Sequence, residues 1–242
     1  MKLQRIDLHI HSALSACGDD IMSPQLILEQ AVQKKLNLIS ITDHNTVQHS
    51  ILACKLSEDM SIRVIPGVEL TSREEVHLLA YFPNIEAIIK MEKEIDNYLP
   101  GKKNNSRVFG DQLYYDLKGE IIGIDDTLRQ VALNIGLDNL VDFIHKIEGI
   151  AVPAHVDKDR FSLLSQLGFL DQEAAYDAVE VSKFKWRKEK FQLGNTWSSF
   201  PVIAGSDSHG VEDIGLFFME DNQEEIRNFI SLKDFLRKSK QQ

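Results

Sequence analysis

The segment IDLHIHS near the start of the chain places His9 and His11 two residues apart, at the end of a predicted strand. A β-strand turns successive side chains to opposite faces, so both imidazoles leave the backbone on one face, together with Asp7. Two imidazoles on one face can bind the same metal ion. An isolated pair of this kind is more often incidental in a buried strand, so the metal hypothesis depends on further ligands from the rest of the chain.

Further imidazoles and carboxylates lie where other apolar strands end or begin. They are His44 after ISITD, Glu69 in PGVEL, His77 in HLLAYF, His155 after IAVPA, and Asp207 with His209 in GSDSH. In parallel α/β proteins the functional groups gather at the C-terminal ends of the strands, where the loops meet. A mixed set of imidazoles and carboxylates suits Mn, Fe or Zn, whereas an all-oxygen set would favour Mg or Ca.

The candidate ligands outnumber the positions around one metal ion. The full set is His9, His11, Asp19, His44, Glu69, His77, His155, Asp207 and His209. Because one ion takes roughly four to six ligands, we expect two or three divalent ions that share bridging carboxylates. Asp19 belongs to the turn CGDD, and the choice between Asp19 and Asp20 stays open.

Several neighbouring residues are expected to have supporting roles. Asp7 and Asp43 are interpreted as groups that orient adjacent imidazoles. His49 and His145 fall in predicted helices away from the strand ends, so both are expected to be structural or exposed. Cys17 could supply a soft ligand, but a small apolar residue of the turn is the favoured role.

The elements that must position these side chains alternate between strand and helix. Apolar runs predict strands at 2–9, in LNLISIT, IRVIPGVEL, VHLLAYF, GIAVPAH and DAVEVS, and in PVIAGSDSH. Helical spacing predicts helices that begin at Ser23-Pro24, span 47–57, 85–98 and 140–147, follow Asp171, and span 185–193. The first two strands flank a helix, so we expect them to pair in parallel. The polar stretch 99–137 interrupts the alternation of strands and helices. It is interpreted as an insertion or lid, because it is too short for a core of its own.

Length and composition favour one large domain with a proper core, since the chain has 242 residues, 43% of them hydrophobic and 26% charged. The formal net charge of −10 argues against a non-specific nucleic-acid coat, although bound divalent ions would reverse the sign locally. The chain has two cysteines, no signal peptide and no run of about 18 apolar residues. These features favour a cytoplasmic protein without a membrane span.

The motif series DLHIHS, TDHN, PGVE, HLLAYF, PAH and SDSH resembles the PHP (polymerase and histidinol phosphatase) family of metal-dependent phosphoesterases, from Asp7 to His209. The resemblance implies an α/β fold, a distorted (β/α)7 TIM-like barrel that forms a single domain over 1–242. It also implies a trinuclear metal centre at the C-terminal rim of the barrel. The family usually has an aspartate soon after the first motif. Here Ala16-Cys17-Gly18 follows Ser15, so the carboxylate arrives later, and Asp19 matches the family better than Asp20.

The resemblance further implies hydrolysis of phosphate monoesters of nucleotides or oligonucleotide ends, by attack of a hydroxide that bridges two metal ions. The residues expected to carry catalysis are His9, His11, Glu69, Asp207 and His209. Substrate phosphate is expected to meet Lys158, Arg160 and Arg187. The expected partner is a small phosphorylated substrate, a nucleotide or a short nucleic-acid end, with no membrane and no obligate protein partner.

Three alternatives stay open. A histidinol-phosphate-type phosphatase would use the same centre, and the compressed stretch 99–137 lacks the larger helical insertion of nucleotide-acting members. An amidohydrolase-type hydrolase often needs a metal-bridging lysine, for which Lys183 is the candidate. A non-catalytic metal-binding barrel is the third alternative, although it would be expected to lose some of the ligands.

Overall fold

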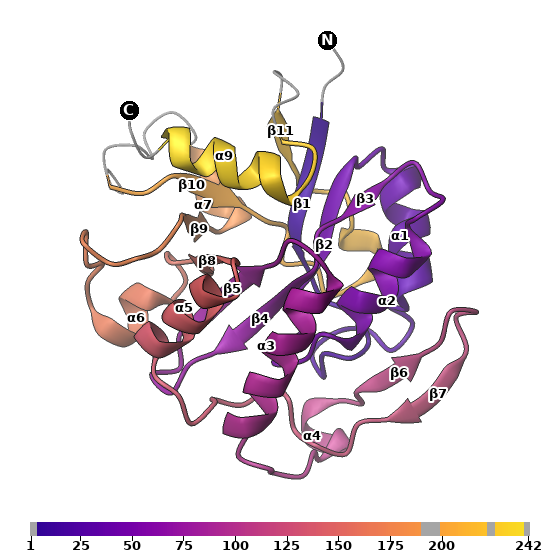
Figure 1. Ribbon diagram of the computed structural model, residues 1–242. Helices are drawn as coiled ribbons and strands as arrows, with labels where there is room; N and C mark the ends of the chain where they lie inside the picture. Colours follow the sequence, from indigo (N-terminus) through magenta and orange to yellow (C-terminus); the bar gives the residue numbers. More distant parts are fainter. Residues whose placement is uncertain (1–3, 190–198, 222–225, 240–242) are drawn as a thin grey trace.

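The chain is organised around its first strand, β1 (Gln4–Ile10), which pairs in parallel with β2 (Leu38–Ile41) and antiparallel with β11 (Met219–Asp221) (Figure 1). The computed structural model describes residues 4–189, 199–221 and 226–239. Both faces of β1 are covered, because the apolar Ile6 and the polar His9 are equally buried. The parallel pairing of β1 with β2 confirms the expectation for the first two strands.

The remaining strands are short. They are β3 (Arg63–Val64), β4 (Gly67–Thr71), β5 (His77–Tyr81), β6 (Leu113–Tyr115), β7 (Ile121–Ile124), β8 (Ile150–Pro153), β9 (Val179–Val181) and β10 (Val202–Ala204). Within the described residues they form sheets ordered β11-β1-β2-β3, β4-β5-β8, β9-β10 and β6-β7. The β4-β5-β8 sheet is antiparallel, whereas β9 and β10 are parallel.

The helices cover the strands from outside. They are α1 (Pro24–Gln33), α2 (Gln48–Leu56), α3 (Ile85–Tyr98), α4 (Ser106–Phe109), α5 (Leu137–Lys146), α6 (Leu163–Leu167), α7 (Lys183–Glu189) and α9 (Phe229–Ser239), with a 3₁₀ turn η1 (Val211–Asp213). The predicted starts of α1 and α3 are confirmed, because the side chains of Ser23 and Asn84 accept hydrogen bonds from the backbone of the first turn. The mixed α/β class is thus confirmed.

Backbone hydrogen bonds join strand ends from different sheets. Asp207 N–H donates to the carbonyl of His9 at 2.9 Å, and Glu69 N–H donates to the carbonyl of Asp43 at 3.1 Å. Val156 N–H donates in the same way to Glu180 at 2.8 Å. These bonds link the ends of β10 with β1, β2 with β4 and β8 with β9. No continuous ladder closes the described strands into one sheet, so the distorted (β/α)7 barrel stays a prediction.

Three predicted elements differ from the structure. IRVIPGVEL contains two strands, because Pro66 between β3 and β4 has no N–H to donate to a ladder. The helix expected after Asp171 is wrong: the Asp171 carboxylate accepts from Glu173 N–H at 2.9 Å and forms a turn instead. The basic helix α7 begins at Lys183, and the part of the predicted helix from 190 to 193 lies outside the described residues.

The β6-β7 hairpin of the stretch 99–137 projects from the body of the molecule but is anchored at its base (Figure 1). Leu113 N–H donates to Ala13 at 2.8 Å, and the Tyr115 hydroxyl donates to the Asp20 carbonyl at 2.7 Å. Tyr115 N–H donates to Nε2 of His49 at 3.0 Å. The hairpin is therefore attached to the loop that follows β1, and its role as a lid stays a prediction.

His49 is fixed as a neutral ring by its partners. Because Nε2 accepts from Tyr115 N–H, the ring proton lies on Nδ1, which donates to the Ser12 hydroxyl at 2.8 Å. Ser12 in turn donates to Asp43 at 2.6 Å. Burial lowers the pKa of His49 from its ordinary value of 6.5 to about 4. The expectation that His49 is structural is in keeping with these contacts.

We expect this ring to make stability pH-dependent. Between pH 6.5 and 4 the unfolded chain binds a proton at His49 and the folded chain does not, so stability is lost as the pH falls. From pH 7 to pH 5 the loss from this group is about 2 kcal/mol. Urea unfolding at both pH values should show a smaller difference for His49→Gln than for the wild type. His145→Gln, which alters a half-buried histidine on α5, is the control, and an equal loss in all three proteins would contradict the prediction.

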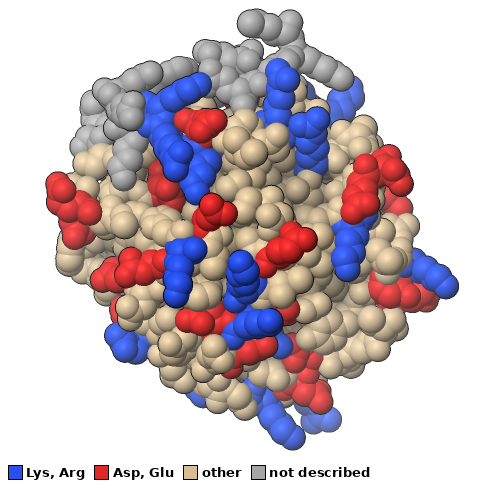
Figure 2. All heavy atoms as spheres, in the orientation of Figure 1, with Lys and Arg blue, Asp and Glu red and all other residues tan. Residues whose placement is uncertain are grey.

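Acidic and basic side chains are interspersed on the face seen in Figure 2 and do not form one basic surface. Among the helices that the structure describes, none has the length and apolar character needed to cross a bilayer.

Candidate metal centre

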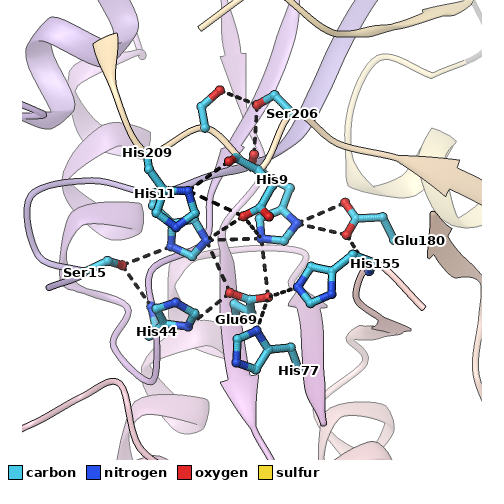
Figure 3. Close-up of polar contacts among 12 residues, drawn as sticks. His9, His11, Ser15, His44, Glu69, His77, His155, Glu180, Ser206 and His209 are labelled. Atoms are coloured by element: carbon cyan, nitrogen blue, oxygen red, sulfur yellow. Dashed lines mark hydrogen bonds and ion pairs between the residues drawn. The ribbon is translucent and has the colours of Figure 1, made fainter. Parts of the chain in front are cut away.

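Glu69 lies at the centre of the predicted ligands and is 1% exposed. The period-two pattern of β1 carries His9 and His11 to it, and the isolated bridge between His44 and Glu69 holds the end of β2 beside β4. Its Oε1 lies 3.5 Å from His9 Nε2, 3.0 Å from His77 Nδ1 and 3.4 Å from His155 Nε2, and its Oε2 lies 3.3 Å from His11 Nε2 and 3.1 Å from His44 Nδ1. Both carboxylate oxygens therefore face imidazoles, as a bridging ligand requires (Figure 3).

Several of these buried polar atoms lack a hydrogen-bond partner among the described residues. They are both oxygens of Glu69 and Nδ1 of His44, His77 and His155. Buried polar atoms without partners are costly, and clusters of them at one place indicate a missing ligand or ion. Imidazole nitrogens and carboxylate oxygens are donors that divalent transition metals prefer, so the residues present fit such ions.

Glu180 orients His9 from the side opposite to Glu69. Both Glu180 oxygens lie 3.0 Å from His9 Nδ1, and Oε2 also accepts from His155 N–H at 3.0 Å. The carboxylate therefore holds the ring proton on Nδ1, which leaves the Nε2 lone pair of His9 pointing into the centre.

Ser15 and the Asp207 carbonyl orient two further rings in the same way. The Ser15 hydroxyl donates to Asp43 at 2.7 Å, so it accepts from His11 Nδ1–H at 3.1 Å. His209 Nδ1–H donates to the Asp207 carbonyl at 2.9 Å. Nε2 is therefore the free nitrogen on both rings. Asp43 thus orients His11 through Ser15, whereas Asp7 accepts from the backbone N–H groups of Ser206 and His9 at 3.0 and 3.4 Å.

Asp207 joins the centre from the loop after β10. Its Oδ1 lies 3.4 Å from His9 Nε2 and 3.3 Å from His11 Nε2, and Oδ2 pairs with the Lys158 ammonium. The backbone of Asp207 has φ 51° and that of His155 has φ 29°, which non-glycine residues rarely adopt. Such strain costs on the order of 1 to 3 kcal/mol and is typical of functional sites.

The protonation states of Glu69 and His209 favour cation binding, whereas His11 must first lose a proton. Burial opposes ionisation of Glu69, but His77, His9 and His44 outweigh it and hold the pKa of its carboxyl well below its ordinary value. Burial lowers the pKa of His209 to about 4, with the nearby His11 contributing. The carboxylates that face His11 outweigh its burial and raise its pKa to about 9, so protons and metal ions compete for this ring.

Among the described residues, three groups of candidate ligands overlap. Within each group, the ligand atoms all lie within 4.8 Å of one another. The groups are His9, His11 and Glu69; His44, Glu69 and His77; and His11, Cys17, His44 and His209. The structure thus brings together eight of the nine predicted ligands and leaves out Asp19. Asp19 is exposed and its carboxylate lies beside Gly210. Cys17, which was expected to be a small apolar residue of the turn, lies in one of the ligand groups.

A cavity of about 410 Å³ opens above the cluster, a size typical of small-molecule sites. Lys158 and Arg160 line it, as expected of groups that meet substrate. Arg187 is not among its lining residues within the described chain, since its guanidinium donates to the Leu216 carbonyl at 2.8 Å and packs over Phe217.

Sequence reasoning missed three other residues of the cavity wall, namely Gln130, Asp159 and Phe161. Gln130 comes from the stretch 99–137, and its amide nitrogen lies 3.5 Å from His44 Nε2. Phe161 stacks on His77 with ring centroids 4.8 Å apart and planes 10° apart. The one signal in the sequence for Phe161 is its place directly after HVDKDR, the segment that supplies Lys158 and Arg160.

The fold and the site define an α/β domain with a buried cluster of imidazoles and carboxylates at its strand ends that could hold metal ions. The PHP domain family matches residues 7–230, so the chain belongs to this family, as the motif series predicted.

Two curated relatives match shorter stretches. A phosphoribosyl 1,2-cyclic phosphate 1,2-diphosphodiesterase of Eggerthella lenta is 31% identical over 78 residues, 30% of this chain and 29% of that protein. A 5′-3′ exoribonuclease of Haemophilus influenzae is 25% identical over 100 residues, 38% of this chain and 35% of that protein. The matched stretches therefore span about a third of these relatives.

Among solved structures, the lesion-specific endonuclease PfuEndoQ of Pyrococcus furiosus superposes with a TM-score of 0.71 at 19% identity. The superposition covers 98% of this chain and 56% of that one. At this identity the similarity is one of fold.

Proposed function

We propose that the protein is a metal-dependent phosphoesterase that hydrolyses phosphate esters of nucleotides or of nucleic-acid ends. The observation that carries the proposal is Glu69, a buried carboxylate whose two oxygens face five imidazoles at the base of a cavity with cationic groups on its wall. The two curated relatives, a phosphodiesterase and an exoribonuclease, support the reaction class.

Different residues of the cluster would hold different metal ions. His9, Glu69 and Asp207 would hold one ion, and His77 and His155 would hold a second through the shared Glu69. Bound divalent ions supply Lewis acidity and lower the pKa of coordinated water to about 7. The chain itself contributes rings whose Nδ1 atoms are held by Glu180, Ser15 and the Asp207 carbonyl, so little reorganisation is needed when the substrate arrives.

Lys158 is the group best suited to a substrate phosphate. Its ammonium pairs with Asp207 at the cavity wall, and facing carboxylates raise its pKa above the ordinary value although burial opposes this. It therefore keeps its charge at neutral pH. A phosphate in the cavity would have this cation, that of Arg160 and the imidazoles around it.

Phe161 supports a nucleotide as the substrate. One face of the ring packs on His77, yet the residue is 42% exposed, so its other face is open to a planar group in the cavity. Its backbone has φ 55°, which is strained for a bulky residue, and its carbonyl accepts from His77 N–H at 2.9 Å. The ring is thus held rigidly beside the centre, as a stacking platform for a nucleobase would be.

The test is phosphate release by protein loaded with Mn, Fe or Zn. The panel holds a nucleoside monophosphate, a 5′-phosphorylated oligonucleotide, histidinol phosphate, ribose 5-phosphate and a cyclic amide. We expect release from the nucleotide substrates that a chelator abolishes and added metal restores. Histidinol phosphate as the best substrate would favour the small-molecule phosphatase, amide hydrolysis the amidohydrolase, and an inert holoprotein the non-catalytic barrel.

Phe161→Ala should separate nucleotide binding from phosphate binding. We expect kcat/KM for the nucleoside monophosphate to fall about tenfold, roughly 1.4 kcal/mol, because a base–aromatic stack is lost. Ribose 5-phosphate has the same sugar phosphate without a base, so its kcat/KM should change little. Phe169→Ala, which removes a 63% exposed ring outside the cavity lining, is the control. An equal fall for both substrates would refute the stacking role.

The amidohydrolase alternative lacks support at one position. Lys183, the candidate for a metal-bridging lysine, begins α7, and its ammonium lies over the ring of Phe184 at 5.9 Å. It is not among the described residues that line the cavity.

A further inference from the structure

The loop between β1 and α1 brings a thiol to the edge of the metal centre. Sγ of Cys17 and one nitrogen from each of His11, His44 and His209 all lie within 4.8 Å of one another. His44 is 3% exposed, and its Nδ1 makes no hydrogen bond among the described residues, although Oε2 of Glu69 lies 3.1 Å away. We propose that Cys17 is a metal ligand and that, with these three imidazoles, it forms a site that prefers zinc.

Two of the three rings are oriented through Nδ1, so that Nε2 is the nitrogen left for a metal ion. His11 Nδ1–H is held by Ser15 at 3.1 Å, and His209 Nδ1–H is held by the Asp207 carbonyl at 2.9 Å. Their Nε2 atoms are therefore unprotonated in the neutral rings and available as ligands. The stacking of the His11 and His209 rings, with centroids 4.3 Å apart, keeps them side by side at this end of the centre.

The backbone of the loop fixes Cys17 in place. Ser15 N–H donates to Ser12 at 3.0 Å, and Gly18 N–H donates to Ser15 at 2.8 Å, so the chain is tightly wound on both sides of Cys17. A Cβ at Gly18 would lie 2.5 Å from the Ser12 carbonyl oxygen, which makes glycine necessary for this approach. Asp19 N–H then donates to the carbonyl of His209 at 2.8 Å and ties the loop to a third ligand segment.

The thiol lies where a carboxylate was expected. Asp19, predicted as the ligand from this loop, is exposed and belongs to none of the described ligand groups. A set of one thiolate and three imidazoles suits a tetrahedral zinc ion, whereas the groups around Glu69 combine imidazoles with a carboxylate and also accept Mn or Fe. The centre therefore has two kinds of metal position, and the one with the thiolate is selective for a softer ion. Binding there releases the thiol proton to solvent.

Cobalt provides a direct test, because thiolate ligands give Co²⁺ an intense near-ultraviolet charge-transfer band that imidazoles and carboxylates do not. Apo-protein titrated with Co²⁺ should develop this band, and Cys54→Ser should develop it equally. Cys17→Ser should lose the band and bind zinc at least about 100-fold more weakly, beyond the effect typical of losing a group behind a ligand. Cys17→Asp should bind metal without the band.

A second measurement needs no change at Cys17. In Cys54→Ser the single remaining thiol should react with a thiol reagent in the apo-protein and be protected by zinc. Equal labelling with and without zinc, a band that persists in Cys17→Ser, or bound cobalt without a band in the wild type would each overturn the proposal.

The inference rests on the metal centre of the proposed function, but its readouts are independent of hydrolysis. A holoprotein with the band and no phosphate release would refute the phosphoesterase alone. Phosphate release without the band would refute the thiolate ligand alone.

Discussion

Glu69→Gln is expected to lose most of the bound metal and to lower kcat/KM for phosphate release by at least about 10³-fold, roughly 4 kcal/mol. The substitution keeps the size of the side chain and removes its negative charge. His77 and His44 face different oxygens of this carboxylate, at 3.0 and 3.1 Å, so no other described residue occupies the same bridging position. The measurements are metal content by mass spectrometry and phosphate release at saturating metal.

The matched control for this variant is Glu75→Gln, an exposed glutamate in the turn between β4 and β5. It changes the net charge by the same amount next to the same two strands, and we expect wild-type metal content and activity. If Glu69→Gln kept its metal and lost activity, Glu69 would act on the substrate and not as a bridge. If it kept both, the proposed centre would be wrong.

Most residues of the buried cluster were predictable because their signal in the sequence is regular. His9 and His11 follow the period of a strand, and the other predicted ligands stand at strand ends, where loops of an α/β fold converge. Asp19 was the exception. Two acidic residues in a turn suggested a carboxylate ligand. The hydrogen bond from Asp19 N–H to the His209 carbonyl instead turns Asp19 toward solvent. The tight turn at Gly18 leaves Cys17 facing the imidazole rings.

Antiparallel pairing was not predictable from the same patterns. The segments that form β4 and β5 read as two apolar strands of a parallel alternation, and only the short connection through 72–76 signals a hairpin. A helix between strands requires a longer crossover, so connection length was the better guide here. The hairpin matters for the site, because it places His77 beside Glu69 from the neighbouring strand.

Phe161 and Glu180 share a different difficulty. Each contacts a histidine that is distant along the chain, so sequence spacing does not reveal the contact. Glu180 lies between two valines of β9 and is 2% exposed. A lone acid inside an apolar strand is costly to bury without a partner, so it was a usable signal for a group that serves a cationic or proton-donating neighbour.

Glu180→Gln is the test of that role, and we expect metal affinity to fall about 10- to 100-fold. Glutamine offers one carbonyl oxygen where the carboxylate offers two oxygens, yet both His9 Nδ1–H and His155 N–H need an acceptor here. One of these donors would then face an amide N–H₂. The neutral amide also polarises the His9 ring less, which weakens Nε2 as a ligand.

A positioning role predicts a specific pattern in the Glu180→Gln kinetics. Activity should be low at limiting metal and should recover as metal is added, because the ligands themselves remain; Glu180→Asp, which keeps the charge, should recover part of the affinity. Asp177→Asn is the control, since Asp177 accepts from His145 Nε2 at 2.8 Å and from Ala151 N–H at 2.8 Å away from the ligand groups. A loss of folding stability in Glu180→Gln with unchanged metal affinity would show that this carboxylate only supports the packing of β8 and β9. A shifted metal affinity with Asp177→Asn unaffected would show that the carboxylate acts on the metal through His9.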